Sequence, residues 1–536
     1  MDKSTLSNYG WLVIVTLILA VMLAFATPFG TYVGDGVVSV ANGIVGTSND
    51  ATAEENISQS EVEWAVKTDH GIEYNTFKYY NTLEDAIEAV NNNSYITASS
   101  KLKNNNVVVG ISKDGNAPVV RLIKDVHINI TNTIPLKNSL IIDLNGHTFS
   151  INNSVPAFSL SNNLLFSILD TTKSGQLECN YNLFYEKDYN LTKIDINFKD
   201  LNIVYNNTNI NSEHNGLFYC YVNKEHKNNN NINIENCNIN FNSVASVRIF
   251  NAEGFTVNLN NINVNAKSEY LFYGFQIKNS IINAKNMDFN ITINVNNSVV
   301  KETKYFSAIF STKNTTLNVS DLNTKFVGNS THENAQSFYV FGAHDDNVNA
   351  NNIVAKINSN GYKQVNLITI QDGASIVNIN NSSFNAVVKN EYNNNPNQYN
   401  GHSGFIVIWN DNNTINIKNC NNITNQEGSL LSAFVDIMGC NNNIYIDNST
   451  NNNLKDTKMS VAFSFSKATA TPTASDNNIY VSNFKSESLY SFYNYNDTPA
   501  KTNSVYLGKN TNIIFEKSKF YNNNILYNII NTDAIY

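Results

Sequence analysis

A break in strand alternation recurs along this chain and limits the folds that it can adopt. In residues 232–241, apolar and polar residues alternate, but the apolar spacing from Ile234 to Cys237 is three residues instead of two. Successive side chains of a strand point to opposite faces. An extra residue therefore requires a corner or a bulge if both halves are to face one interior. The residue just before the alternation resumes is Asn236.

The same three-residue spacing recurs, with Asn or Asp just before the resumption at ten places. Asn and Asp are the non-glycine residues that best tolerate the left-handed backbone of a tight corner. Roughly a fifth of the chain is Asn, far above ordinary usage, and this abundance explains single matches but not ten at fixed places. Gly146 adds a glycine corner. The expected corner residues are Gly146, Asp200, Asn236, Asn261, Asn286, Asp321, Asn352, Asn381, Asn419, Asn448 and Asn483.

Each repeat contains a corner and an aromatic strand, and no repeat can bury its own apolar face. Successive Asn and Asp corners are 25 to 38 residues apart, with segments such as 217–219 and 338–341 between them. Stacked units bury these faces against one another. The pattern predicts an all-β fold, a single-stranded right-handed parallel β-helix (solenoid) of roughly a dozen coils at about 4.8 Å per coil. An N-terminal apolar helix and a short capping helix would complete it.

The first residues predict export. Residues 11–26 are apolar and uncharged, and residues 24–26 (Ala-Phe-Ala) fit a signal-peptidase site before Thr27. The apolar character extends beyond this site, so residues 11–33 would hold the chain in a membrane if they are uncleaved. A third interpretation is a pilin-like leader, because Gly10 precedes the apolar segment, although Val15 replaces the expected Glu.

The chain divides into four expected regions. Residues 1–46 are a signal peptide or N-terminal membrane anchor, and the polar residues 47–81 are a linker. Residues 82–118 form the N-terminal cap of the β-helix. Within it, a helix begins at the N-cap Thr82 and carries a buried stripe that includes Leu83 and Ile87. Residues 119–536 form the β-helix itself.

Residues 139–153 contain an Asp, a Gly turn and a His, which raises the question of an active site. The apolar spacing from Leu144 to His147 is again three residues. His147 therefore occupies the register of Cys237, and we expect a histidine packed inward at a corner rather than a catalytic one.

Part of the chain also resembles a known family. The runs TLEDAIEAV, VVRLIKDVHINI and IPLKNSLIIDLNGHTFSI, within residues 82–151, resemble the opening of bacterial surface proteins of the right-handed parallel β-helix, or pectate-lyase-like, superfamily. In that family a short helix precedes strands that end in a turn of the Leu-Asn-Gly-His-Thr type. The resemblance covers about 70 residues and implies the fold more than an activity.

The resemblance makes polysaccharide cleavage an alternative to be weighed. Lyases of this fold use stacked acidic residues to bind calcium and an Arg or Lys as base, and this chain has two Arg residues, Arg121 and Arg248. The hydrolase motifs of the family are present only as scattered matches in the wrong order. The remaining acid/base candidates are His344, Asp345 and Asp346. Adjacent carboxylates bind a cation such as calcium or share a proton, but in a polar loop they are more often simply solvated.

The charge and the cysteine content limit the classes of partner and cofactor that the chain is expected to bind. The net charge of −9, without a basic stretch, argues against nucleic acid. The five Cys residues form no CxxC pair, so we expect small buried residues and neither a metal nor another cofactor. We therefore expect a secreted or cell-surface protein with a structural or adhesive role. Its coil faces and loops would bind carbohydrate or a host or cell surface, and the alternative is a polysaccharide lyase or glycoside hydrolase.

Overall fold

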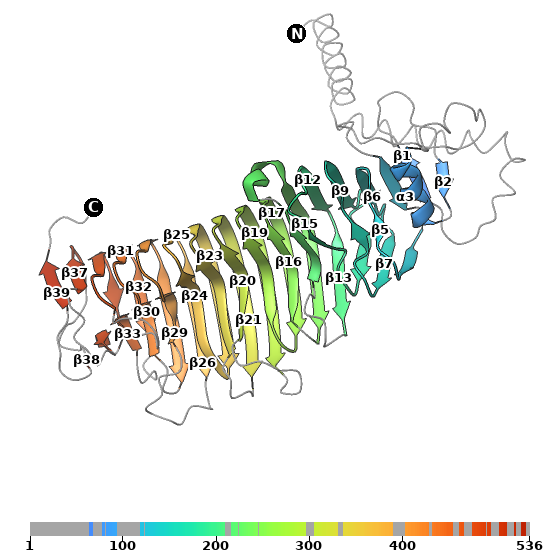
Figure 1. Ribbon diagram of the computed structural model, residues 1–536. Helices are drawn as coiled ribbons and strands as arrows, with labels where there is room; N and C mark the ends of the chain where they lie inside the picture. The colour runs from blue at the N-terminus through green and yellow to red at the C-terminus, as the bar shows by residue number, and fades with distance from the viewer. Residues whose placement is uncertain are drawn as a thin grey trace, which may run out of the picture. The chain divides into compact units, whose positions relative to one another are not determined.

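The protein is an all-β chain in which two long, mostly parallel sheets are built from stacked coils. The computed structural model describes residues 64–67, 78–80, 82–93, 118–122, 124–208, 216–222, 224–244, 246–295, 305–330, 336–389, 402–427, 431–453, 460–465, 474–488, 490–494, 503–511, 519–520 and 527–531. In this part of the chain the strands follow one another side by side, as expected for a parallel β-solenoid (Figure 1).

The larger sheet has 25 described strands. They are β1 (Trp64–Lys67), β2 (Lys78–Tyr80), β3 (Val119–Leu122), β4 (Val126–Ile130), β6 (Leu140–Asp143), β7 (Thr148–Asn153), β9 (Leu164–Leu169), β10 (Gln176–Cys179), β12 (Ile194–Lys199), β13 (Asn202–Asn207), β15 (Asn231–Ser243), β17 (Thr256–Ser268), β19 (Ile281–Val295), β21 (Thr316–Ser330), β23 (Asn347–Asn360), β25 (Ile376–Asn380), β26 (Ser383–Lys389), β28 (Thr414–Lys418), β29 (Asn421–Glu427), β31 (Asn443–Asp447), β32 (Thr450–Asn453), β34 (Asn478–Ser482), β35 (Lys485–Ser486), β37 (Asn503–Leu507) and β39 (Tyr527–Asn531).

The smaller sheet has 14 described strands. They are β5 (Ile134–Pro135), β8 (Phe158–Ser159), β11 (Phe184–Lys187), β14 (Gly216–Tyr221), β16 (Val247–Glu253), β18 (Phe272–Lys278), β20 (Tyr305–Lys313), β22 (Gln336–His344), β24 (Tyr362–Asp372), β27 (His402–Ile408), β30 (Leu431–Ile437), β33 (Ser460–Phe465), β36 (Tyr490–Asn494) and β38 (Lys519–Phe520). A 3-10 helix, η1 (Lys224–Asn229), precedes β15.

The register is the same from coil to coil. β15 pairs in parallel with β17 so that Ile234 lies beside Leu259 and Cys237 beside Ile262, and the extra residue falls at the same place in both strands. The inward side chains form one continuous core. The rings of Phe184, Phe218 and Phe250 stack in sequence, with centroid distances of 4.6 and 4.8 Å.

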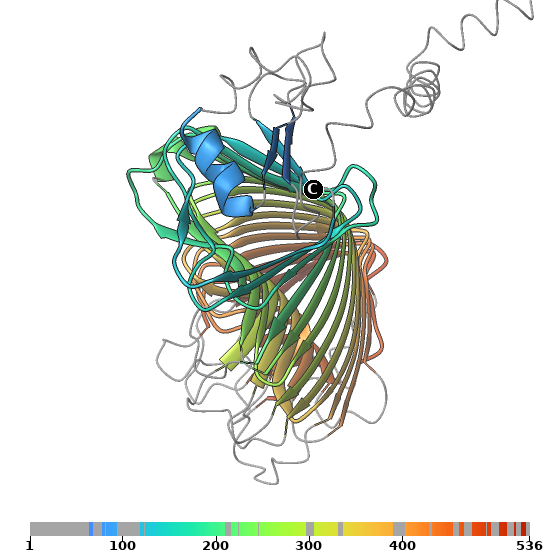
Figure 2. The same cartoon turned by 90° about the vertical axis from the view of Figure 1, so that its right-hand side faces the viewer.

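The first coil is covered by a helix and an antiparallel strand. The helix α3 (Leu83–Asn91) begins at Thr82, whose Oγ1 accepts a hydrogen bond from Asp85 N–H, and it buries Leu83 and Ile87 as predicted. Figure 2 shows α3 at this end of the stack. β1 pairs antiparallel with both β2 and β3. Part of the segment expected to be a linker, 47–81, therefore forms strands that continue the sheet and cover its first edge.

Two other expectations need correction. His147 has the predicted register, but its side chain is 31% exposed and lies beside Asp125, with 3.6 Å between Nδ1 and Oδ1. The positive φ of Asn145 and of Gly146 turns the chain just before it. In addition, the smaller sheet has more strands than the aromatic segments indicated. β30, for example, has all seven residues buried and so shows no alternation.

The two sheets differ in exposure. On the smaller sheet, Val407 and Met438 form a separate apolar cluster against Trp409, on the opposite face from the core residue Ile406. Both faces are therefore buried there. The larger sheet keeps the alternation of buried and exposed residues along its strands, as in β17 and β19. Its outer face is the open surface of the solenoid.

All five cysteines are buried free thiols, in agreement with the expectation. No described helix is both long enough and apolar enough to cross a bilayer. The apolar segment 11–33 and the expected N-terminal helix lie outside the described residues.

Candidate functional site

The acid/base candidates His344, Asp345 and Asp346 follow one another at the corner between β22 and β23. Asp346 points into the protein and is 3% exposed. Its Oδ2 accepts hydrogen bonds from Thr312 Oγ1 and from His344 N–H, both at 2.7 Å, and its Oδ1 accepts one from Thr315 N–H at 2.8 Å. Burial nevertheless raises the pKa of Asp346 to about 6. This carboxyl is a structural acceptor, without access to a solvent-borne substrate.

The other two members of the cluster turn elsewhere. Asp345 has a positive φ of 55°, and its Oδ1 accepts a hydrogen bond from Ala374 N–H. His344 Nδ1 lies 3.1 Å from Asp372 Oδ2. The three residues do not form the pair of accessible carboxyl groups, facing one substrate, that glycoside hydrolysis uses. Among the described residues, no group of three or more His, Cys, Asp or Glu side chains is placed to hold a metal ion such as calcium.

The eleven expected corner residues, named here the corner ladder, all have a positive φ, from 45° to 85°. Asn236 Nδ2 donates to Asp200 Oδ1, and Asn261 Nδ2 donates to Asn236 Oδ1, both at 2.9 Å. Asn419 and Asn448 continue the pattern in later coils. The positive φ provides the corner, and in these coils the amide of the corner residue bonds to the coil before it.

The corner ladder is not a single unbroken chain of bonds. Asn381 Nδ2 donates to Asn351 Oδ1 rather than to Asn352, and Asn483 Nδ2 donates to Asp447 Oδ1 rather than to Asn448. The backbone corner is thus more regular than the amide contacts that accompany it.

A second ladder lies inside the protein and was not predicted from the sequence. We name Asn413, Asn442, Asn477 and Asn503, each no more than 1% exposed, the buried asparagine ladder. Asn442 Oδ1 accepts hydrogen bonds from both the backbone N–H and the Nδ2 of Asn413, at 2.9 and 2.8 Å. The same double contact joins Asn442 to Asn477 and Asn477 to Asn503. These residues satisfy the buried backbone at the start of each strand.

The signal for this ladder was present in the sequence. Each of these asparagines is two residues before an inward Ile or Val, as Asn442 is before Ile444. The asparagine therefore occupies an inward position in the regular alternation of the strand. It is overlooked when only breaks in the alternation are used as a signal. In earlier coils the same register holds Asp346 and Ser375, which are joined by a hydrogen bond from Asp346 N–H to Ser375 Oγ.

A third set of asparagines runs along the open face of the larger sheet. We name it the outer asparagine row, and it consists of Asn197, Asn233, Asn258, Asn283, Asn318, Asn349, Asn378 and Asn416. Each Nδ2 donates to the Oδ1 of the preceding member, at distances from 2.7 to 3.1 Å. All eight side chains are at least partly exposed.

Stacked tyrosines continue this row in the later coils. Tyr445 occupies the register after Asn416, and Tyr480 and Tyr506 follow it. The ring centroids of Tyr445 and Tyr480 are 4.7 Å apart, and those of Tyr480 and Tyr506 are 4.4 Å apart, with planes within 9° of parallel. The stacked rings cover one another's faces. This part of the row therefore presents ring edges and hydroxyl groups to a ligand, and not ring faces.

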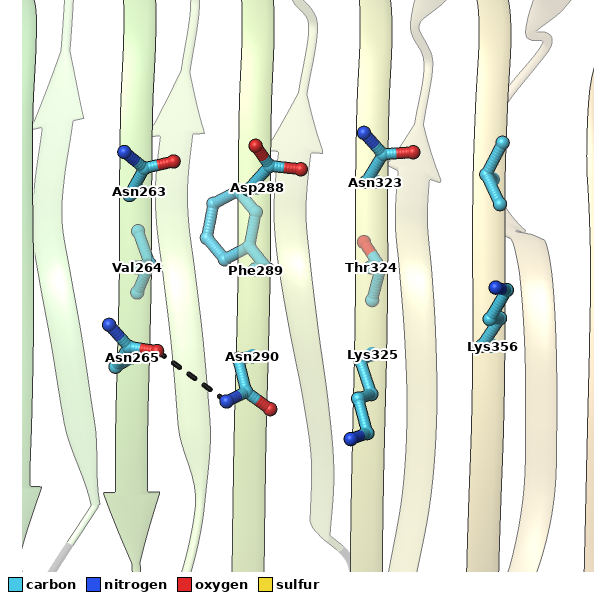
Figure 3. Close-up of a pocket in the computed structure, with 11 residues that line it drawn as sticks. Asn263, Val264, Asn265, Asp288, Phe289, Asn290, Asn323, Thr324, Lys325 and Lys356 are labelled. Atoms are coloured by element: carbon cyan, nitrogen blue, oxygen red, sulfur yellow. Dashed lines mark hydrogen bonds between the residues drawn. The ribbon is translucent and has the colours of Figure 1, made fainter.

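Two shallow grooves lie on the larger sheet, on either side of the corner ladder. One, of about 650 Å³, is lined by Asn258, Asn283, Asn318 and Asn349 of the outer asparagine row, among others. The other, of about 530 Å³, crosses β17, β19, β21 and β23 beyond the corner (Figure 3). Both are open surfaces without the enclosure of a catalytic cleft.

Neither a family model, nor a curated protein, nor a solved structure matches this chain at a significant level.

Proposed function

We propose that this chain is an exported cell-surface protein, structural or adhesive in role, which binds an extended carbohydrate along the outer asparagine row. The observation that carries the proposal is that eight successive coils present an amide at one register on an open face. A groove follows four of these amides.

The chemistry of the row suits sugar hydroxyl groups. Each amide uses one N–H and one oxygen lone pair within the row, and a second N–H and a second lone pair remain. A hydroxyl group both donates and accepts, so it is complementary to such a pair. The coils repeat at about 4.8 Å, so the row offers donors and acceptors in a straight line. An extended, ribbon-like polysaccharide is the ligand class that uses such a line fully.

The apolar segment at residues 11–26 supports export, and the strand pairing supports membership of the right-handed β-helix, pectate-lyase-like architecture. The surroundings of Asp346 give polysaccharide cleavage no comparable support, because its oxygens accept hydrogen bonds inside the protein. Sequencing the N-terminus of the protein isolated from its own cells would distinguish a cleaved signal peptide, an uncleaved anchor and a pilin-like leader.

The binding proposal is tested with the full-length chain and a panel of polysaccharides. Soluble β-1,4-glucan, xylan, mannan, pectin, alginate and mucin glycans are immobilised, and retention of the protein is measured together with the release of reducing or unsaturated ends. We expect retention on at least one extended glycan and no release of new ends. The proposal would be overturned if the protein bound none of these polysaccharides. Release of new chain ends by the wild type, lost in Asp346→Asn, would establish the enzymatic alternative.

A further inference from the structure

The groove beyond the corner ladder contains a row of side chains that changes from amides to two successive lysines. Asn240, Asn265 and Asn290 share one register, and Asn265 Nδ2 donates to Asn240 Oδ1 at 3.3 Å. The next two positions of this register are Lys325 and Lys356. Figure 3 shows both lysines on neighbouring strands, on the same face as Asn265 and Asn290.

The two lysines are placed where their charges disfavour each other. Lys325 and Lys356 are exposed and directly opposite on adjacent parallel strands, which are about 4.8 Å apart. Like charges directly opposite on neighbouring strands are destabilising. Within the described part of the chain, neither lysine forms an ion pair with an Asp or Glu side chain. A bound anion between the two ammonium groups would remove this repulsion.

We infer that Lys325 and Lys356 bind a tetrahedral oxyanion ester, a sulfate or phosphate group carried by the glycan, an inference that rests on the proposed function. Lysine presents a compact point charge with three donors and binds phosphate groups in this way. A sulfate or phosphate ester has three terminal oxygens to share between two ammonium groups, whereas a carboxylate has two. The groove contains two lysines and no arginine. The amides of Asn290 and Asn323, which also line the groove, provide additional donors for the peripheral oxygens.

One acidic residue limits where the anion can lie. Asp288 is opposite Asn323, in the row next to the lysines, and it also lines the groove. Diagonal neighbours on adjacent strands are about 7–8 Å apart, close enough for its charge to be felt. Asp288 therefore repels an anion from its own row and confines the ester to the row of Lys325 and Lys356.

The chain provides a matched control for this pair. Lys278 and Lys313 are also opposite on adjacent strands, β18 and β20, but they belong to the smaller sheet and line neither groove. The variants K325Q/K356Q and K278Q/K313Q lose the same charge. Both change exposed or partly exposed residues, and circular dichroism melting verifies that each remains folded.

The probes are dextran, dextran sulfate, phosphorylated dextran and carboxymethyl dextran, which share one backbone, and the measurement is the dissociation constant for the full-length chain. We expect tighter binding to the sulfated or phosphorylated polymer than to dextran or carboxymethyl dextran. K325Q/K356Q should weaken this binding by roughly tenfold or more, as expected from the loss of charged hydrogen bonds. K278Q/K313Q should leave it unchanged, and Asp288→Asn should strengthen it. The sulfate and phosphate arms then identify which ester the site prefers.

Three results would overturn the inference. The first is equal affinity for the four polymers, and the second is tighter binding to the carboxymethyl polymer. The third is an equal loss of affinity in the two double variants, because that result would indicate general electrostatic attraction. Each of them leaves the outer asparagine row free to bind neutral glycans, so the proposed function is judged separately on the glycan panel.

Discussion

The outer asparagine row and the buried asparagine ladder use the same side chain in the same sheet for opposite purposes. In the outer asparagine row, amides bond to amides on an open face, as Asn318 Nδ2 does to Asn283 Oδ1 at 3.0 Å. In the buried asparagine ladder, one oxygen accepts from both the backbone and the side chain of the preceding coil, as Asn442 Oδ1 does. The first leaves hydrogen-bonding groups for a ligand, and the second uses them inside the fold.

This difference separates two meanings of an asparagine-rich repeat. A buried amide is needed because a backbone N–H without an acceptor is costly in the interior. An exposed amide row has no such requirement, because water can replace each bond at little cost. Under the proposed function, the regular exposed row along eight coils contacts a ligand outside the protein, and its contribution to stability is small. Substitutions in the buried asparagine ladder and in the outer asparagine row should therefore have different effects on stability and on binding.

The largest effect is expected for Asn442→Leu. The substitution leaves the buried Asn413 backbone N–H without its acceptor, and it removes two side-chain hydrogen bonds, one with Asn413 Nδ2 and one with Asn477 Oδ1. At about 1–3 kcal/mol for the unsatisfied N–H and about 0.5–1.5 kcal/mol for each lost hydrogen bond, the free energy of unfolding should fall by about 2–6 kcal/mol. Denaturant unfolding measures this loss. The control is Asn443→Leu, at the adjacent outward position, which should cost under about 1 kcal/mol, and similar losses in the two variants would contradict the distinction.

The acidic member of the inward register should make stability depend on pH. Burial raises the pKa of Asp346 to about 6, whereas an unfolded Asp titrates near about 3.9. Between these values the folded state holds the proton and the unfolded state does not. This contribution to stability is therefore present at low pH and is lost as the pH rises through about 6. A shift of about two units corresponds to roughly 3 kcal/mol.

Asp346→Asn isolates this contribution. The free energies of unfolding of the variant and the wild type are compared at pH 4 and at pH 7, and other carboxyl groups cancel in the difference. As the pH rises from 4 to 7, the wild type should lose up to about 3 kcal/mol of unfolding free energy relative to the variant. A difference that is the same at both pH values would show that the carboxyl does not titrate as its burial implies.

A smaller effect is expected at the corner ladder. Asn261 has a φ of 54° and donates to Asn236 Oδ1. Asn261→Val places a β-branched residue in the left-handed region and removes the amide, at a cost of about 2 kcal/mol. Asn261→Gly accepts this φ and should cost under about 1 kcal/mol. The denaturation midpoints of the two variants measure the contrast, and equal midpoints would count against a conformational role for the corner residue.

The sequence revealed the exposed features of this fold more readily than the buried ones. The corners were visible because Asn236 and its equivalents interrupt a period of two, and positive φ favours Asn, Asp or Gly at such positions. The helix α3 was visible because Thr82 and the apolar spacing define its start and face. The strands of the smaller sheet were partly missed because burial on both faces removes the alternation that identifies a strand.

The candidate site was harder to predict than the fold. Asp345 and Asp346 are adjacent in the chain, but the positive φ of Asp345 directs Asp346 inward, and sequence proximity did not reveal this. The outer asparagine row depends on which coil lies against which, with offsets from 25 to 38 residues between successive members. Only the strand pairing brings Asn283 beside Asn318, or Lys325 beside Lys356.

Substitutions in the outer asparagine row should have the smallest effect on stability and the largest effect on glycan binding. They provide the most direct test of the proposed binding surface. Asn283→Leu/Asn318→Leu alters the outer asparagine row, and Asn294→Leu/Asn329→Leu alters an equivalent amide pair in the same two strands. Both double variants should lie within about 1–2 kcal/mol of the wild type in stability. Isothermal titration with the tightest-binding glycan of the panel should show roughly tenfold or greater weakening in the first variant and wild-type affinity in the second. Equal affinities in the two variants would contradict the assignment of the outer asparagine row as the binding surface.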